Sequence, residues 1–247
     1  MTIGQSAEVS TVVTSRAIEL FAEAPRARGT RMNEVAGAQG FVVLYPEQPV
    51  TANPLKCWNW FAVANQKRGQ GEPAILAAMI SKVASDQKID LAKVYIAGIS
   101  AGGAMTAIMG ATYPELFAAL GIHSGIAYGL VTQMSEAIVA MRSPKADTSA
   151  LGELVVTAMA ERRKPMPVQI FQGRLDQSVN VENANLLAGQ WKHANGRRHL
   201  HVKIVDEIAH AWSGGSAAGT YTDEKGPDAS NAFVDFFLHV EKEHGHH

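Results

Sequence analysis

Short apolar runs that end at glycine or polar turns recur along the chain, and the stretches between them are long enough for helices. Most of these runs are nearly continuous in Val, Ile, Leu, Phe and Ala, as is typical of strands buried on both faces of a parallel sheet. The pattern predicts strands over residues 41–44, 94–98, 118–122, 168–171 and 201–205. Helical spacing between them predicts helices over residues 72–85, 101–112, 181–195 and 231–242. This alternation indicates an α/β fold with a mostly parallel sheet and helices on both faces.

A long interval between two predicted strands, residues 127–167, is helical in pattern and contains several methionines. A cap over a site and packing against the core both fit this segment, and packing is the favoured interpretation. With 247 residues, 47% of them hydrophobic, the chain is long enough to bury a substantial core. We therefore expect a single domain over residues 1–247.

Charge and apolar content argue against several classes of partner. The 22 Lys and Arg residues almost balance the 23 Asp and Glu residues, so no basic field of the kind that attracts nucleic acid is present. No stretch is apolar for long enough to span a bilayer, and residues 1–15 lack the basic and apolar regions of a signal peptide. We expect no nucleic-acid or membrane partner, and the sequence leaves the localisation open.

The sequence Gly-Ile-Ser-Ala-Gly at residues 98–102 directly follows one predicted strand and opens the next predicted helix. A serine in so tight a turn needs neighbours without bulk, and Gly98 and Gly102 meet this need. The turn is typical of the nucleophile of an α/β-hydrolase, with Ser100 as the nucleophile and the Ala101 N–H as an oxyanion donor at the helix N-terminus. The alternative is an ordinary strand-to-helix turn in which the serine caps the helix.

An acid and a base are expected after later strands, because an α/β-hydrolase places its triad in the chain order serine, acid, histidine. Asp176 is the first carboxylate after the strand at 168–171, and it is the predicted acid. His210 follows the strand at 201–205 in a loop of small residues, and it is the predicted base. The other carboxylates of this region lie in the helical interval or beside the last strand: Asp147, Glu153, Glu161 and Asp206.

Other histidines compete with His210 for a role. His199 and His201 would place both rings on one face of a strand, as metal ligands often are, but no third ligand follows them. His123 ends the strand at 118–122 on the same sheet edge as Ser100, where a hydrogen-bonded structural role is favoured over substrate contact. The glycine spacing matches neither a dinucleotide loop nor a P-loop, so the sequence implies no metal and no cofactor.

Together with several further segments in the same order, these residues resemble the polyhydroxybutyrate depolymerase-like esterases, which are related to feruloyl and acetylxylan esterases. The resemblance implies hydrolysis of a carboxylic ester, with Ser100, Asp176 and His210 at the triad positions. It is carried by Gly-Thr-Arg-Met-Asn at 29–33, Tyr-Pro-Glu-Gln at 45–48, Cys-Trp-Asn-Trp-Phe at 57–61, Gly-Ile-Ser-Ala-Gly-Gly-Ala-Met at 98–105, His-Ser-Gly at 123–125, His-Ala-Trp-Ser-Gly-Gly at 210–215, Tyr-Thr-Asp at 221–223 and Gly-Pro-Asp-Ala-Ser at 226–230.

One departure from the family lies at the N-terminus. Members usually carry a strand that ends in a His-Gly-Cys-type turn before the segment at 29–33, and this turn supplies a second oxyanion donor. Residues 14–21 stand in its place without a glycine. We therefore expect reduced or missing N-terminal strands, an atypical segment over residues 1–28, and only the Ala101 N–H as an identified donor. The loss of one such donor costs about a hundredfold to a thousandfold in rate.

Three tryptophans are candidates for an apolar substrate surface, because rigid aromatic faces bind acyl or phenolic groups with little loss of entropy. For Trp212, two residues after the predicted base, substrate contact is favoured, whereas for Trp58 and Trp60 substrate contact and core packing are equally good interpretations. His123 completes the predicted set of substrate-binding residues.

The sequence thus predicts a serine esterase of the polyhydroxyalkanoate or polyester depolymerase type, acting through an acyl-enzyme on a small or polymeric ester. A feruloyl or acetyl carbohydrate esterase is the alternative within the same chemistry, because these enzymes share the triad and differ in the groove. A catalytically impaired binding module, or a truncated product without a full oxyanion hole, is the alternative of another class. The oligomeric state is left open, and an exposed sheet edge would permit pairing into a dimer.

Overall fold

The computed structural model describes residues 18–21, 29–196 and 200–244. The strands of its main sheet are all paired in parallel, in the order β2-β1-β3-β4-β5-β6. Each predicted strand is confirmed, with ends that differ by at most two residues. The strands are β1 (Ile18–Phe21), β2 (Val42–Leu44), β3 (Val94–Ile99), β4 (Ala119–His123), β5 (Val168–Gly173) and β6 (Leu200–Val205).

Strand β1 is the one that the hydrophobic pattern does not predict. It lies between β2 and β3, where Leu20 is paired with Leu44 on one side and with Ile96 on the other. A run of only 4 residues that contains Glu19 is too short to show a clear period. In the described part of the chain, the sheet ahead of β2 is therefore reduced to this one short strand.

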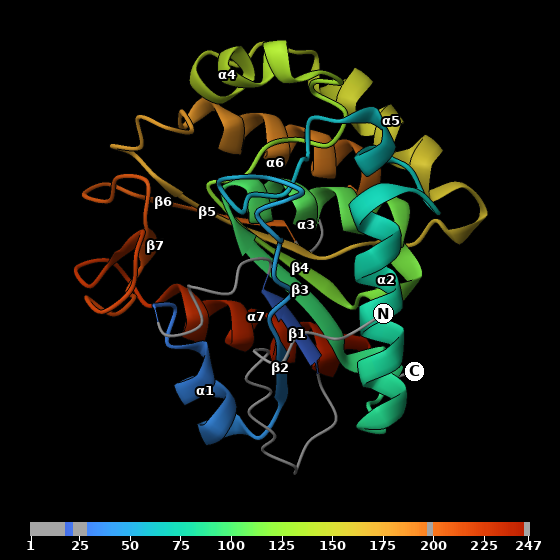
Figure 1. Ribbon diagram of the computed structural model, residues 1–247, viewed down its shortest axis with the longest axis vertical. Helices are drawn as coiled ribbons and strands as arrows, with labels where there is room; N and C mark the ends of the chain where they lie inside the picture. The colour runs from blue at the N-terminus through green and yellow to red at the C-terminus, as the bar shows by residue number, and fades with distance from the viewer. Residues whose placement is uncertain (1–17, 22–28, 197–199, 245–247) are drawn as a thin grey trace.

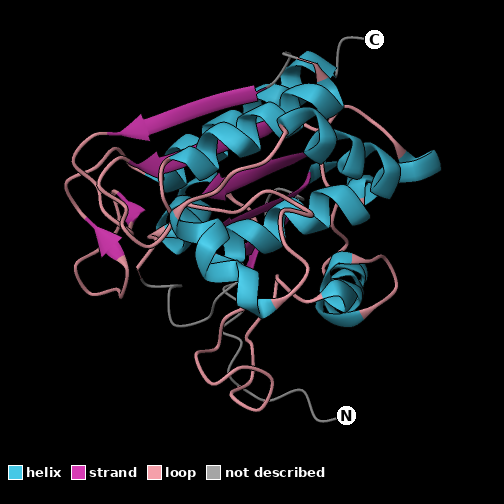
Figure 2. Cartoon of the chain, turned by 90° about the horizontal axis from the view of Figure 1, so that it is seen from above, coloured by secondary structure: helices cyan, strands magenta, loops and turns pink. Residues whose placement is uncertain are grey.

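Helices cover both faces of the sheet (Figures 1 and 2). In Figure 1, α1 and α7 lie below the sheet, α3 and α6 lie above it, and α4 and α5 form the outermost layer. The four predicted helices correspond to α2, α3, α6 and α7. The helices are α1 (Met32–Gln39), α2 (Gly71–Asp86), α3 (Ala101–Thr112), α4 (Met134–Arg142), α5 (Thr148–Met159), α6 (Glu182–Asn195) and α7 (Ala229–His244).

The sheet separates two hydrophobic clusters, and β3 contributes to both. Val94 and Ile96 pack in the cluster that contains α2 and α3, whereas Tyr95 and Ala97 pack in the cluster that contains α1 and α7. All six residues of β3 are buried, which explains its continuous apolar sequence. The strand is therefore a rigid support for the turn that follows it.

The helical interval at 127–167 folds into α4 and α5. Leu151, Val155 and Met159 of α5 are buried in the core, as the packing interpretation requires, whereas Met134 and Ile138 of α4 are 71% and 63% exposed. No helix within the described ranges combines the length and apolar character needed to cross a bilayer.

Candidate active site

The turn between β3 and α3 holds Ser100 in a strained backbone conformation, with φ 58° and ψ −120°. A Cβ placed on Gly98 would lie 2.4 Å from the carbonyl carbon of Gly102, so this position requires glycine. The Ser100 N–H donates to the carbonyl oxygen of His123 at 3.0 Å, which fixes the turn to the end of β4. The Ser100 side chain does not cap α3 and the residue is only half-buried, so the hydroxyl is left for chemistry.

Asp176 and His210 form a buried hydrogen-bonded pair. The His210 Nδ1 atom lies 2.7 Å from Asp176 Oδ2, and the exposed fractions of the two side chains are 14% and 0%. Asp176 Oδ1 accepts from the N–H groups of Ser178 and Val179 at 2.9 and 2.8 Å. Burial by itself would raise the pKa of Asp176, but the hydrogen bonds from His210 and Val179 outweigh it, and the pKa is lowered. The Asp176 side chain is therefore held as a carboxylate.

The segment after β6 carries His210 across the carboxyl edge of the sheet toward Ser100. It first passes over the end of β5, where a Cβ on Gly173 would lie 2.3 Å from the Ile208 carbonyl oxygen. It then reaches the end of β4, where the Ser213 N–H donates to His123 Nε2 at 3.2 Å. His210 lies between these two crossings in the chain, and its Nδ1 atom is engaged with Asp176, so Nε2 is the nitrogen that remains for proton transfer.

A small second sheet, β7 (Trp212–Ser213) and β8 (Thr222–Asp223), anchors this segment beyond His210. The Trp212 N–H donates to the carbonyl oxygen of Tyr221 at 2.7 Å. Figure 2 shows the strands of the main sheet pointing toward the side of the molecule where these loops lie. His210, the predicted base, thus lies in a loop that is fixed by contacts on both sides.

The oxyanion site is described only in part. Ala101 is the first residue of α3, and its N–H belongs to the turn of the helix whose N–H groups have no intrahelical acceptor. A second donor was expected to be missing because residues 14–21 stand in place of the turn that supplies it. Of these residues the structure describes only 18–21, which form β1, and residues 22–28 also lie outside the described part of the chain. Phe21, the last residue of β1, is paired with Ala97 of β3, the strand that leads to Ser100.

All three candidate tryptophans are buried, with exposed fractions of 4% for Trp58, 8% for Trp60 and 1% for Trp212. Trp212 packs against His123 with ring centroids 5.3 Å apart, and its Nε1 donates to the Ser230 hydroxyl. Burial of this degree favours core packing for all three, including Trp212, for which substrate contact was preferred. The position of Trp212 two residues after His210 in the sequence does not determine which way its ring points.

His123 is 1% exposed and hydrogen-bonded, as in the structural role favoured for it, so its ring offers no open surface to a substrate. His201 packs against Phe236, whereas His199 lies outside the described residues. Among the residues that the structure describes, no group of three or more His, Cys, Asp or Glu side chains is arranged to hold a metal ion.

The buried His123 leads to a prediction about stability in acid. Burial, helped by the nearby His210, lowers the pKa of His123 from 6.5 to about 3, so at intermediate pH the unfolded chain binds a proton here that the folded chain does not. The free energy of unfolding should fall as the pH is lowered through this range, by at most about 1.4 kcal/mol per pH unit from this residue. When the free energy of unfolding is measured with urea at several pH values in this range, its slope against pH should be shallower for His123→Gln than for the wild type. The exposed His239 on α7 provides the control, His239→Gln, which should keep the wild-type slope, and a wild-type slope in His123→Gln would contradict the prediction.

Three side chains beside the predicted triad were not predicted as site residues. Gln172 Nε2 donates to Asp176 Oδ2 at 3.2 Å, and the Ser124 hydroxyl also hydrogen-bonds to this carboxylate. Tyr221 is 59% exposed, and its ring meets the His210 ring edge-on at a centroid distance of 6.2 Å. The sequence could have indicated Gln172 and Ser124 as site residues, because both are polar residues at the carboxyl ends of buried strands.

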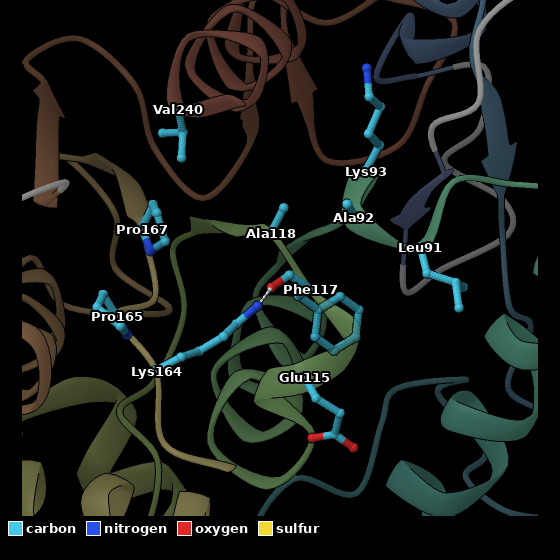
Figure 3. A pocket seen from close by; sticks show the side chains of 10 residues that line it. All are labelled: Leu91, Ala92, Lys93, Glu115, Phe117, Ala118, Lys164, Pro165, Pro167 and Val240. Carbon is cyan, nitrogen blue, oxygen red and sulfur yellow. Dashed lines mark hydrogen bonds between the residues drawn. The ribbon is translucent and has the colours of Figure 1, made fainter. Parts of the chain in front are cut away.

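A separate cavity lies at the opposite edge of the sheet (Figure 3). Its volume is about 460 Å³, and Lys93, Ala118 and Pro167, which line it, directly precede β3, β4 and β5. The ammonium group of Lys164 donates to the Phe117 carbonyl oxygen at 2.6 Å inside it. Because this is the amino edge of the strands, the cavity is remote from Ser100 and is not part of the same site.

The sequence matches that of known esterases. Residues 9–202 match the family described as Esterase PHB depolymerase. Poly(3-hydroxyalkanoate) depolymerase C of Paucimonas lemoignei is 35% identical over 159 residues, which are 63% of this chain and 38% of that protein. Acetylxylan esterase A of Talaromyces purpureogenus is 30% identical over 172 residues, which are 66% of this chain and 44% of that protein. The chain thus spans less than half the length of both relatives.

Solved structures show the same fold at low identity. The acetyl xylan esterase from Aspergillus awamori superposes with a TM-score of 0.72 at 18% identity, over 93% of this chain and 91% of that one. A putative dienelactone hydrolase from Klebsiella pneumoniae gives a TM-score of 0.62 at 16% identity, over 93% and 89% of the two chains. These likenesses identify the α/β fold of the hydrolase esterases. Since the family match covers most of the sequence, the chain belongs to the Esterase PHB depolymerase family.

Proposed function

We propose that the chain is a serine-dependent carboxylic ester hydrolase that acts through an acyl-enzyme, with Ser100 as nucleophile, His210 as general base and Asp176 as the acid that orients it. The observation that carries this proposal is the buried 2.7 Å hydrogen bond between Asp176 and His210, on a segment that crosses toward the strained turn of Ser100. Family membership supports ester hydrolysis as the chemistry.

In the first half of the reaction, Ser100 Oγ attacks the ester carbonyl carbon while His210 Nε2 takes the hydroxyl proton. The carbonyl oxygen gains negative charge, which the Ala101 N–H at the positive end of α3 stabilises. When the tetrahedral intermediate collapses, the bond to the alcohol oxygen breaks and the proton on His210 passes to that oxygen. The alcohol leaves and an acyl group remains on Ser100.

The second half repeats these steps with water. His210 takes a proton from the water as its oxygen attacks the acyl carbon, and the proton then returns to Ser100 Oγ as the carboxylic acid is released. Throughout, the Asp176 carboxylate holds the Nδ1 proton of His210 and stabilises the imidazolium. The hydrogen bonds from Ser178 and Val179 keep this carboxylate ionised and fixed.

For the substrate, we propose esters of hydroxyalkanoates, in oligomeric or polymeric form. The match to a poly(3-hydroxyalkanoate) depolymerase supports this assignment. Tyr221, whose ring meets the His210 ring edge-on, is 59% exposed and gives the site an apolar rim against which aliphatic chains can pack. Acetylated carbohydrate is the second candidate, because several matched relatives at about 30% identity are acetylxylan esterases.

A comparison of substrates tests this assignment. The kcat/KM for 3-hydroxybutyrate oligomers is expected to exceed that for acetylated xylan and for methyl ferulate by at least about tenfold, because the rim is apolar and one well-placed apolar group contributes a factor of this size. Rates measured with Ser100→Ala serve as the background. A higher kcat/KM on acetylated xylan would assign the chain to the second candidate instead.

A further inference from the structure

Besides its hydrogen bond with His210, Asp176, the proposed acid of the triad, lies at the end of a series of buried hydrogen bonds. Ser124 directly follows β4 and is fully buried, and its hydroxyl hydrogen-bonds to the Asp176 carboxylate. The Ser124 N–H donates to the Phe171 carbonyl oxygen at 2.8 Å, so its backbone is fixed to β5, the strand that leads to Asp176. His123 lies behind Ser124, with Nδ1 at 3.1 Å from the Ser124 hydroxyl oxygen.

In the series of hydrogen bonds from Ser213 through His123 and Ser124, each donated hydrogen points toward Asp176. The Ser213 backbone N–H donates to His123 Nε2, so this nitrogen carries no proton. His123 is a neutral imidazole at ordinary pH, because burial lowers its pKa to about 3, and its one proton is therefore on Nδ1. That N–H donates to the Ser124 oxygen, and the remaining hydrogen of Ser124 is directed to the carboxylate, which only accepts.

The same segment also contacts the nucleophile. The His123 carbonyl oxygen accepts the Ser100 N–H, and a Cβ on Gly103 of α3 would lie 2.9 Å from that carbonyl oxygen. Ser124 adopts φ 46°, a conformation that a residue other than glycine keeps only where its surroundings enforce it. Residues 123–125 are thus wedged between the turn of Ser100 and the carboxylate of Asp176.

We propose that Ser124, oriented by His123, is a positioning residue of the ester-hydrolysing site, and that its hydroxyl fixes the Asp176 carboxylate in the orientation that His210 requires. This inference rests on the proposed triad. Among the described residues, the titratable side chains that act on Asp176 and His123 are these two themselves and His210, while the nearby ion pair of Arg174 with Asp206 is exposed.

Ser124→Ala removes the hydroxyl without adding bulk. The expected result is a fall in kcat of roughly tenfold, the effect of one hydrogen bond to a charged group, with little change in KM. Without this hydrogen bond, more of the negative charge of the Asp176 carboxylate is available to stabilise the imidazolium form of His210. The acid limb of the profile of kcat/KM against pH should therefore move to higher pH. Ser230→Ala is the matched control, because Ser230 is equally buried and hydrogen-bonded, to Thr30, but does not contact Asp176. Ser230→Ala should leave the acid limb where it is in the wild type, and a shift equal to that of Ser124→Ala would overturn the inference.

A double-mutant cycle distinguishes failure of this inference from failure of the triad. If Ser124 acts through Asp176, adding Ser124→Ala to Asp176→Asn should change kcat little further, whereas fully multiplicative losses would overturn the inference alone. Full activity of Asp176→Asn would instead overturn the triad. A test that needs no variant is the ¹⁵N spectrum of the His123 ring in the wild-type protein, which should show a proton on Nδ1 at neutral pH. A proton on Nε2 would contradict the proposed direction of these hydrogen bonds.

Discussion

Replacing Ser100 with alanine is expected to abolish the hydrolysis of p-nitrophenyl acetate, with a fall in kcat on the order of 10⁶-fold, as for the nucleophile of other serine hydrolases. The reason is that no other group in the turn can form the acyl intermediate. The side chain does not cap α3, so its removal should leave the fold intact, as circular dichroism and thermal unfolding would verify. The measurement is the initial rate under saturating substrate, corrected for spontaneous hydrolysis.

Ser81→Ala is a suitable control for this experiment. Ser81 is an exposed serine on α2 whose hydroxyl donates to the Ala77 carbonyl oxygen within its own helix, far along the chain from the turn. This variant should retain the wild-type rate. If Ser100→Ala hydrolyses the ester as fast as the wild type, another nucleophile is responsible. If wild type and variant are equally inert, the protein is better described as an impaired module.

The strands and the order of the proposed triad residues could be predicted from the sequence for a common reason. β3 and β4 are buried on both faces, so they appear as continuous apolar runs, and parallel strands bring their carboxyl ends to one edge. Ser100 and Asp176 each follow such a run, whereas His210 follows the partly exposed strand β6. The chain order of these three residues is that of an α/β-hydrolase. The glycine at position 98 was recognisable because a side chain there would meet Gly102.

Other features depend on contacts that no local pattern encodes. β1 is central in the sheet but short, so its place is set by pairing with β2 and β3 rather than by its own sequence. The proposed role of Ser124 depends on contacts with Phe171 and Asp176, which lie more than 40 residues further along the chain. The burial of Trp212 follows from its packing against His123 and Phe233, which adjacency to His210 in the sequence does not reveal.

The arrangement of donors around Asp176 determines what its replacement by asparagine should do. Its oxygens accept from Ser178, Val179, Gln172 and His210, and each of these partners is a donor. The amide of Asp176→Asn would direct an NH₂ group at one of them. If it faces His210, the imidazole takes the tautomer with its proton on Nε2, which cannot accept the proton of Ser100. A fall in kcat of about 10⁴-fold is expected, the size seen when the acid of a serine protease triad is changed in this way.

The same variant should lose stability in a pH-dependent way. Burial opposes ionisation of Asp176, but the hydrogen bonds prevail and its pKa is lowered in the folded state relative to the ordinary value of 3.8. The stabilisation from this carboxylate is therefore present above that value and is lost as the pH falls through the lowered pKa. Asp176→Asn should thus be less stable than wild type at neutral pH, with a difference that narrows in strong acid. Asp206→Asn, at an exposed carboxylate paired with Arg174, should show neither the loss of kcat nor this stability difference, because solvent already screens its charge. If Asp206→Asn lost as much kcat as Asp176→Asn, the acid of the triad would instead be Asp206, which directly follows β6.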